Sequence, residues 1–217
     1  MRGKKELFFW GLVSLYLIND LFYLSSDSYI KWMLVDYTVR LVTLIGLFVL
    51  YKEYIIDKGT FCFGSYPLNK TLGIVTVFTI VGVLIFVVIE ANFQSLNFYK
   101  GTSFPEATNV YLHWFDLTIG LLLVALSEEV LFHSYFYALF KDRLAPRNLI
   151  ILSALLFSLI HWSNDMTNIL AVFIWALIAM KIFLHTKSIW PLVIVHLATN
   201  FILFIDVIDT NLFKIGF

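Results

Sequence analysis

The chain has 217 residues, of which 60% are hydrophobic and only 14% are charged. Soluble domains carry about 25% charged residues, so this composition excludes a water-soluble globular protein and indicates an integral membrane protein surrounded by a lipid bilayer. The formal net charge is zero and no Lys/Arg cluster with interleaved aromatic residues occurs, so nothing indicates a nucleic-acid partner.

Seven apolar stretches are long enough for transmembrane helices, which need about 20 mostly apolar residues. Their connections are short, except for residues 92–112, and the chain contains neither an internal repeat nor an interdomain linker. We therefore expect an all-α fold, a polytopic membrane helix bundle in which 1–217 form a single transmembrane domain and 113–206 its motif-bearing core. The expected helices cover residues 7–24, 33–56, 72–91, 113–140, 148–164, 168–185 and 189–206.

Lysine and arginine residues fall mainly on one side of these helices. An N-terminus in the cytoplasm puts eleven of them on the cytoplasmic side and three outside, which is the bias of the positive-inside rule. The apolar run after residue 6 lacks a small-residue cleavage site, so we expect a retained first helix. Short loops and the absence of a targeting extension favour a bacterial cell membrane.

Two adjacent carboxylates, Glu128 and Glu129, lie inside the apolar stretch 113–140. A charge buried in a bilayer costs several kcal/mol unless it is paired or protonated, so both side chains need partners. Residues four apart share a helix face, which pairs Glu129 with His133. Glu128 projects about 100° away from Glu129, so we expect the two carboxylates to point to different places, with Glu128 facing a cavity.

Polar residues on two later stretches offer partners for Glu128. Counted along the helices at about 1.5 Å per residue, Glu128, His161 and His196 all lie roughly 13–21 Å below the cytoplasmic edge. In a partly dry cavity Glu128 would be a base for water, and His161 would hold or protonate the reacting group. His196 and Asn200, four apart, would stabilise an oxyanion. These are the parts needed for peptide hydrolysis without a covalent intermediate.

Other polar residues in the apolar stretches receive structural interpretations. Asp36 and Arg40 are four apart and are expected to pair with each other. Asn19, Asp20 and Glu90 lie near the outer ends of their helices, where contact with water would be enough.

The three polar motifs resemble those of the CPBP family, the intramembrane CAAX proteases and bacteriocin-processing (Abi) proteins. The family has two Glu followed four residues on by Arg, then Phe-x-x-x-His, then His-x-x-x-Asn or Asp. This chain reads Glu128-Glu129-Val-Leu-Phe-His133, Phe157-Ser-Leu-Ile-His161 and His196-Leu-Ala-Thr-Asn200. His133 stands where the family has Arg, so its pairing with Glu129 would be weaker and dependent on pH.

The resemblance implies a glutamate-dependent intramembrane endopeptidase. It would cut peptides or small membrane proteins near the cytoplasmic face, in bacteriocin maturation, self-immunity or peptide signalling. The implied catalytic residues are Glu128, His161, His196 and Asn200, with Glu129 and His133 in support.

Two alternatives remain open at this point. No cofactor is expected, but Glu128, His161 and His196 are also residue types that bind zinc. Because His133 departs from the family pattern, a non-proteolytic membrane regulator that binds a sensor kinase or another membrane partner is the second hypothesis.

Overall fold

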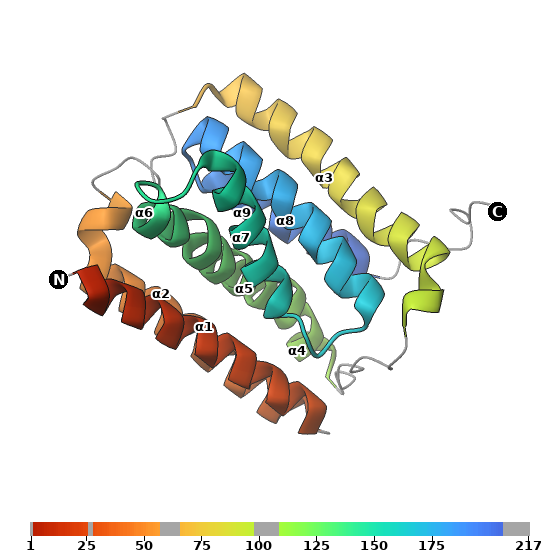
Figure 1. The fold of residues 1–217 in the computed structure, drawn as a ribbon. Coiled ribbons are helices and arrows are strands. Elements are labelled where there is room, and N and C mark those ends of the chain that lie inside the picture. Colours follow the sequence, from red (N-terminus) through yellow and green to blue (C-terminus); the bar gives the residue numbers. More distant parts are fainter. Residues whose placement is uncertain (1, 26–27, 57–65, 98–108, 206–217) are drawn as a thin grey trace.

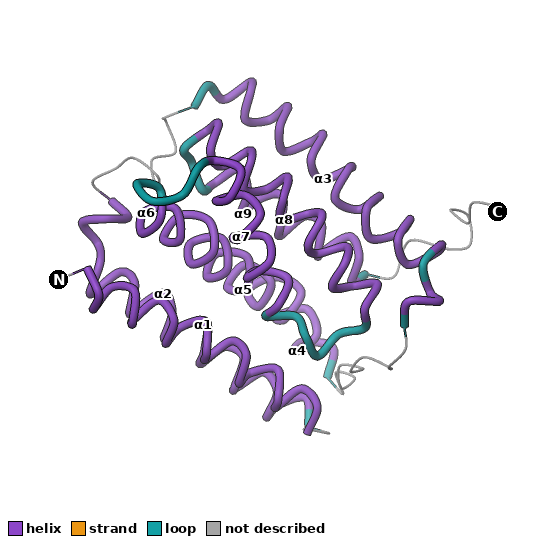
Figure 2. Tube along the Cα trace, viewed as in Figure 1, coloured by secondary structure: helices purple, strands orange, loops and turns teal. Residues whose placement is uncertain are grey.

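The computed structural model describes residues 2–25, 28–56, 66–97 and 109–205, which form helices and loops without a strand (Figure 1, Figure 2). A single 3-10 turn, η1 (Gln94–Leu96), follows the third helix. Six uninterrupted helices are α1 (Arg2–Ser25), α2 (Tyr29–Ile56), α3 (Leu68–Asn92), α7 (Pro146–Leu159), α8 (Met166–Thr186) and α9 (Trp190–Phe204).

The segment with the two glutamates is one continuous helical run over residues 110–140, which we call the motif helix. Its consecutive parts are α4 (Val110–Phe115), η2 (Asp116–Gly120), α5 (Leu121–Glu128), η3 (Glu129–Tyr135) and α6 (Phe136–Phe140). The parts η2 and η3 are π-helical, a wider turn that is frequent at functional sites. The change from α- to π-helix falls between Glu128 and Glu129. Apart from η1, the described residues thus form seven helical segments, which confirms the predicted all-α bundle.

Within the described ranges, four helices are long and apolar enough to cross a membrane: Gly3–Ser25, Tyr29–Val49, Leu68–Asn92 and Met166–Thr186. Their outward faces expose large apolar side chains such as Leu7, Ile45 and Val77, a surface that is stable against lipid and not against water. Length, composition and this apolar exterior together identify an integral membrane protein.

Helix α7 ends earlier than the sequence predicted. The apolar pattern indicated a helix to residue 164, whereas the helix stops at Leu159 and residues 160–163 form a turn. Two contacts with α1 hold this turn: Trp162 Nε1 donates to the Leu17 carbonyl at 3.1 Å, and the Ser163 amide donates to Asp20 Oδ2 at 3.1 Å. At about 1.5 Å per residue, the 14 residues of α7 span less than the roughly 30 Å of a hydrocarbon core.

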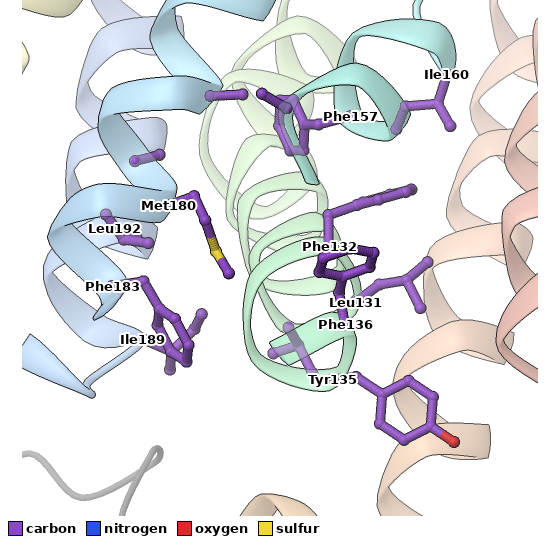
Figure 3. Packing of buried hydrophobic residues seen from close by; sticks show 14 of the residues in the cluster. Leu131, Phe132, Tyr135, Phe136, Phe157, Ile160, Met180, Phe183, Ile189 and Leu192 are labelled. Atoms are coloured by element: carbon purple, nitrogen blue, oxygen red, sulfur yellow. The ribbon is translucent and has the colours of Figure 1, made fainter. Parts of the chain in front are cut away.

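The pair α1 and α2 lies along one side of the bundle and α3 along the opposite side, with the motif helix, α7, α8 and α9 between them (Figure 1). The core lies between the motif helix and its neighbours, where Phe132 packs edge to face on Phe157 with ring centroids 5.6 Å apart (Figure 3). Met180 and Phe183 of α8 are fully buried in the same cluster. Glu128, Glu129 and His133 of the motif helix are buried, so they are enclosed by other helices rather than by lipid.

Helix α3 packs closely on α8 and α9 at Gly82, where an added Cβ would lie 3.0 Å from both Trp175 Nε1 and Thr199 Oγ1. At Gly73 of the same helix a Cβ would meet nothing within 4 Å. We predict that Gly82→Val lowers the free energy of unfolding by about 1–3 kcal/mol relative to Gly73→Val, because only the first change overpacks an interface. Reversible unfolding in detergent micelles measures the difference, and equal stabilities of the two variants would contradict this packing.

Candidate active site

A cavity of about 960 Å³ enters the bundle, and all four residues predicted to be catalytic line it: Glu128, His161, His196 and Asn200. The structure therefore brings together side chains from the motif helix, the turn after α7 and α9, which are separate in the sequence. Irregular backbone at membrane depth is tolerated where it lines a cavity, and the turn that holds His161 does so. Which of these side chains act in catalysis stays a prediction.

The cavity extends toward one end of the bundle. Its wall there comes from the last turns of α1, α3 and α9 and the first turns of α2, α8 and the motif helix, including Tyr23, Tyr29, Glu90, Val110 and Phe204. The described Lys and Arg residues lie mainly toward the opposite end: Arg2, Lys4, Lys5, Lys52, Lys70, Lys141, Arg143, Arg147, Lys181 and Lys187. Lys58, Lys100 and Lys214 are outside the described residues. The cavity thus opens away from the basic end.

Glu129 is fully buried and has a cationic or hydrogen-bonding partner at each carboxylate oxygen. Its Oε2 lies 2.9 Å from His133 Nδ1, which confirms the predicted contact across one turn. The atoms are close, but their angle is not that of a good hydrogen bond. Its Oε1 accepts a hydrogen bond from His196 Nδ1 at 2.8 Å. Both oxygens are therefore engaged, and Glu129 orients His196 rather than facing the cavity.

Glu128 is also buried, but it is engaged at only one oxygen. Arg40 Nη1 donates to Glu128 Oε1 at 2.5 Å, whereas Oε2 forms no hydrogen bond with the described residues. That oxygen lies 3.9 Å from His196 Nε2. Glu128 lines the cavity and Glu129 does not, as expected, but both carboxylates contact one side chain that the sequence did not indicate. The imidazole of His196 lies between them and meets a different carboxylate with each nitrogen.

His161 is oriented by its own chain. Its Nδ1 donates to the Phe157 carbonyl at 2.8 Å, which leaves Nε2 available to a substrate or water in the cavity. His161 forms no ion pair with either glutamate among the described residues. Instead, the Phe157 ring is the common neighbour of the three site histidines, with centroid distances of 5.6 Å to His133, 5.4 Å to His161 and 5.9 Å to His196.

Asn200 lies one helical turn after His196 on α9, which starts with Pro191 in its first turn. The side chain is half-buried and lines the cavity beside His196, as the four-residue spacing predicted. Both residues are presented by the same face of one helix, so their relative position is set by the helix itself.

The polar residues of α1 and α2 contribute more than the sequence indicated. The predicted pair of Asp36 and Arg40 is present, with Arg40 Nη2 3.0 Å from Asp36 Oδ1, but Arg40 also reaches Glu128. The expectation that Asn19 and Asp20 meet water is wrong, because both are buried. Asn19 donates to Asp36 at 3.0 Å and Asp20 holds the turn after α7. The sequence contained one indication of this network, the four-residue spacing of Asp36 and Arg40. That spacing indicated a pair within α2 and not the contact with Glu128.

The zinc alternative uses Glu128, His161 and His196, and each of these side chains has a contact within the protein. Among the described residues, no three His, Cys, Asp or Glu side chains are grouped so that they could hold a metal ion. Glu128 is bound by Arg40, and the Nδ1 atoms of His161 and His196 are bound within the protein.

The comparison with family models gives a match that coincides with the motif helix and the helices that complete the site. Residues 110–202 match the family described as Rce1-like, type II CAAX prenyl endopeptidase Rce1-like. No curated protein and no solved structure matches the chain. The matched region contains all three motifs that resemble the intramembrane CAAX proteases, so the resemblance is confirmed: residues 110–202, a little under half of the chain, are similar to the Rce1-like family of CAAX-type endopeptidases.

Proposed function

We propose that the protein is an intramembrane endopeptidase in which Glu128 activates water. The observation that carries this proposal is that Glu128 lines the cavity and that its buried Oε2 forms no hydrogen bond with the described residues, while Oε1 is bound by Arg40. A carboxylate held in this way is a suitable general base, since it can accept a proton without breaking an existing contact.

The remaining polar groups fit the other steps of peptide hydrolysis. As water attacks the scissile carbonyl carbon, its proton passes to Glu128 Oε2 and the carbonyl electron pair moves to the oxygen. His196 Nε2 and the Asn200 amide stabilise that oxyanion. The hydrogen bond from His196 Nδ1 to Glu129 fixes the orientation of the ring and so the direction of Nε2. The C–N bond then breaks, and the proton is delivered to the leaving amine with help from His161.

The substrate class follows from the family and the cavity. Ligand-binding cavities of about 300–1,000 Å³ enclose most of a small ligand, so this cavity can enclose a short extended segment of a peptide or small membrane protein. We retain bacteriocin maturation, self-immunity and peptide signalling in a bacterial membrane as the roles to examine. A membrane regulator that binds a sensor kinase is the outcome indicated if Glu128 proves dispensable.

The geometry does not support cleavage near the cytoplasmic face, which the depth of the motifs had led us to expect. The cavity opens away from the basic end, and the positive-inside rule puts the basic end in the cytoplasm. We therefore propose that the N-terminus is cytoplasmic and that substrate reaches Glu128 from the outer side of the membrane.

Labelling of single cysteines tests this orientation. In a Cys62→Ser background, we predict that a membrane-impermeant maleimide labels Tyr111→Cys on intact cells and does not label Asp142→Cys, since both positions are exposed but lie at opposite ends of the motif helix. Labelling of both after permeabilisation is the control. Labelling of Asp142→Cys alone would reverse the proposed direction of access.

Substitution of the proposed base tests the reaction. With a farnesylated peptide ending in a Cys-aliphatic-aliphatic-X sequence as the probe, Glu128→Gln should lower kcat by about 10²–10⁴-fold, because the amide cannot accept the proton. The control is Glu90→Gln, which removes the charge of another acidic residue that lines the cavity, near its mouth. It shows whether loss of any negative charge in the cavity is enough to lower kcat. Cleavage of the probe with an unchanged kcat in Glu128→Gln would refute the proposed base.

Chelation tests the metal-free mechanism. Glu128, His161 and His196 are not grouped as metal ligands among the described residues, so we predict that the purified protein cleaves the probe equally well before and after dialysis against EDTA. Loss of cleavage that zinc restores would favour the zinc alternative over water activation by the carboxylate alone.

A further inference from the structure

The guanidinium of Arg40 joins α2 to the motif helix inside the bundle. Its Nη1 donates to Glu128 Oε1 at 2.5 Å, and its Nε and Nη2 lie 3.2 Å and 3.0 Å from Asp36 Oδ1. The side chain is 6% exposed. Arg40 lies outside residues 110–202, so the family match does not include it.

The surroundings of Arg40 restrict its movement. Asp36 is held from the other side by the Tyr23 hydroxyl at 2.5 Å and by Asn19 Nδ2 at 3.0 Å, both from α1. The guanidinium also lies over the ring of Tyr16, 4.5 Å from its centroid. A planar donor with partners on three sides keeps one orientation, and it imposes that orientation on the carboxylate it binds.

Charge makes the contact with Glu128 important. Two adjacent glutamates are buried at membrane depth, where an unpaired carboxylate is costly. Glu129 is served by His133 and His196, whose charge depends on protonation. Of the described residues that line the cavity, Arg40 is the one with a permanent positive charge.

We propose that Arg40 is the positioning residue of Glu128 and supplies, from α2, the permanent cation that position 133 lacks in this chain. By occupying Oε1, it leaves Oε2 as the oxygen that faces His196 Nε2, 3.9 Å away, where water is activated. This inference rests on the proposed function, and it makes α2 part of the active site although Arg40 itself does not touch substrate.

Kinetics of Arg40 variants on the farnesylated peptide test the proposal. Arg40→Gln should lower kcat by about 100-fold with KM changed less than about threefold, because misplacement of a catalytic group affects the chemical step. Arg40→Lys should fall between Arg40→Gln and the wild type, since an ammonium keeps the charge but cannot bridge Asp36 and Glu128 as a fork. The matched control is Arg143→Gln, which breaks an exposed interhelical ion pair with Glu6 and should leave kcat within about twofold.

A second comparison separates positioning from a structural role. If Arg40 acts through Glu128, then Arg40→Gln should cause no further loss of kcat in a Glu128→Gln background, whereas a general structural defect would lower both backgrounds alike. If Arg40→Gln does not fold, the kinetics of Arg40→Lys test the proposal instead. A lowered kcat at unchanged KM in Arg40→Lys supports the proposal, and a wild-type kcat overturns it.

The outcomes distinguish this inference from the proposed function. A wild-type protein that does not cleave the probe would remove both. Cleavage that depends on Glu128 but is the same in Arg40→Gln would leave the endopeptidase in place and overturn the role of Arg40. An effect of Arg40→Gln on KM alone would also overturn it, since positioning of the base acts after the substrate is bound.

Discussion

The bundle depends on the burial of two adjacent carboxylates in one membrane-embedded helix. Glu128 is 1% exposed and Glu129 is fully buried, so the two charges cannot be left to water. Their partners come from α2, from α9 and from the motif helix itself. The contacts with α2 and α9 fix the rotation and depth of these helices relative to the motif helix. Apolar packing alone would permit several such arrangements, because lipid is as apolar as the helix surfaces.

The partners of the two carboxylates differ, and this difference gives them different chemical properties. Glu129 has a histidine at each oxygen and is closed to substrate. Glu128 has a guanidinium at one oxygen and a cavity beside the other. The imidazole of His196 connects the two, because one nitrogen is held by Glu129 and the other faces Glu128. Glu129 thus orients His196, and Glu128 is the carboxylate that we propose to react with water.

The sequence predicted the contacts that regular helix geometry controls. The four-residue spacing indicated the pair of Glu129 with His133 and that of Asp36 with Arg40, and both are present. It could not indicate the contact between Arg40 and Glu128, which are 88 residues apart and meet only when α2 packs on the motif helix. Because Asp36, four residues away, is a sufficient partner for Arg40, the spacing of polar residues did not indicate a second partner.

The turn after α7 and the opening of the cavity also could not be predicted from the sequence, because they too depend on contacts between helices. Ile160 and Trp162 continue the apolar pattern of α7, but hydrogen bonds to Leu17 and Asp20 of α1 stabilise a turn instead. These contacts are tertiary, so hydropathy alone extends the helix past its end. The turn stops the backbone short of the full membrane thickness and sets His161 on the cavity wall.

The contact of Arg40 with Glu128 and the turn after α7 both involve the first two helices, which lie outside the family match. Helix α1 holds the turn that presents His161 and, through Asn19 and Tyr23, holds Asp36. Helix α2 then presents Arg40 to Glu128. In the proposed mechanism, residues 110–202 contain the groups that act on water and substrate, while α1 and α2 contain the charges and hydrogen bonds that orient them. In the proposed mechanism, Arg40 serves in place of the arginine that the family motif has at position 133, because it brings a permanent cation to the glutamate pair from another helix.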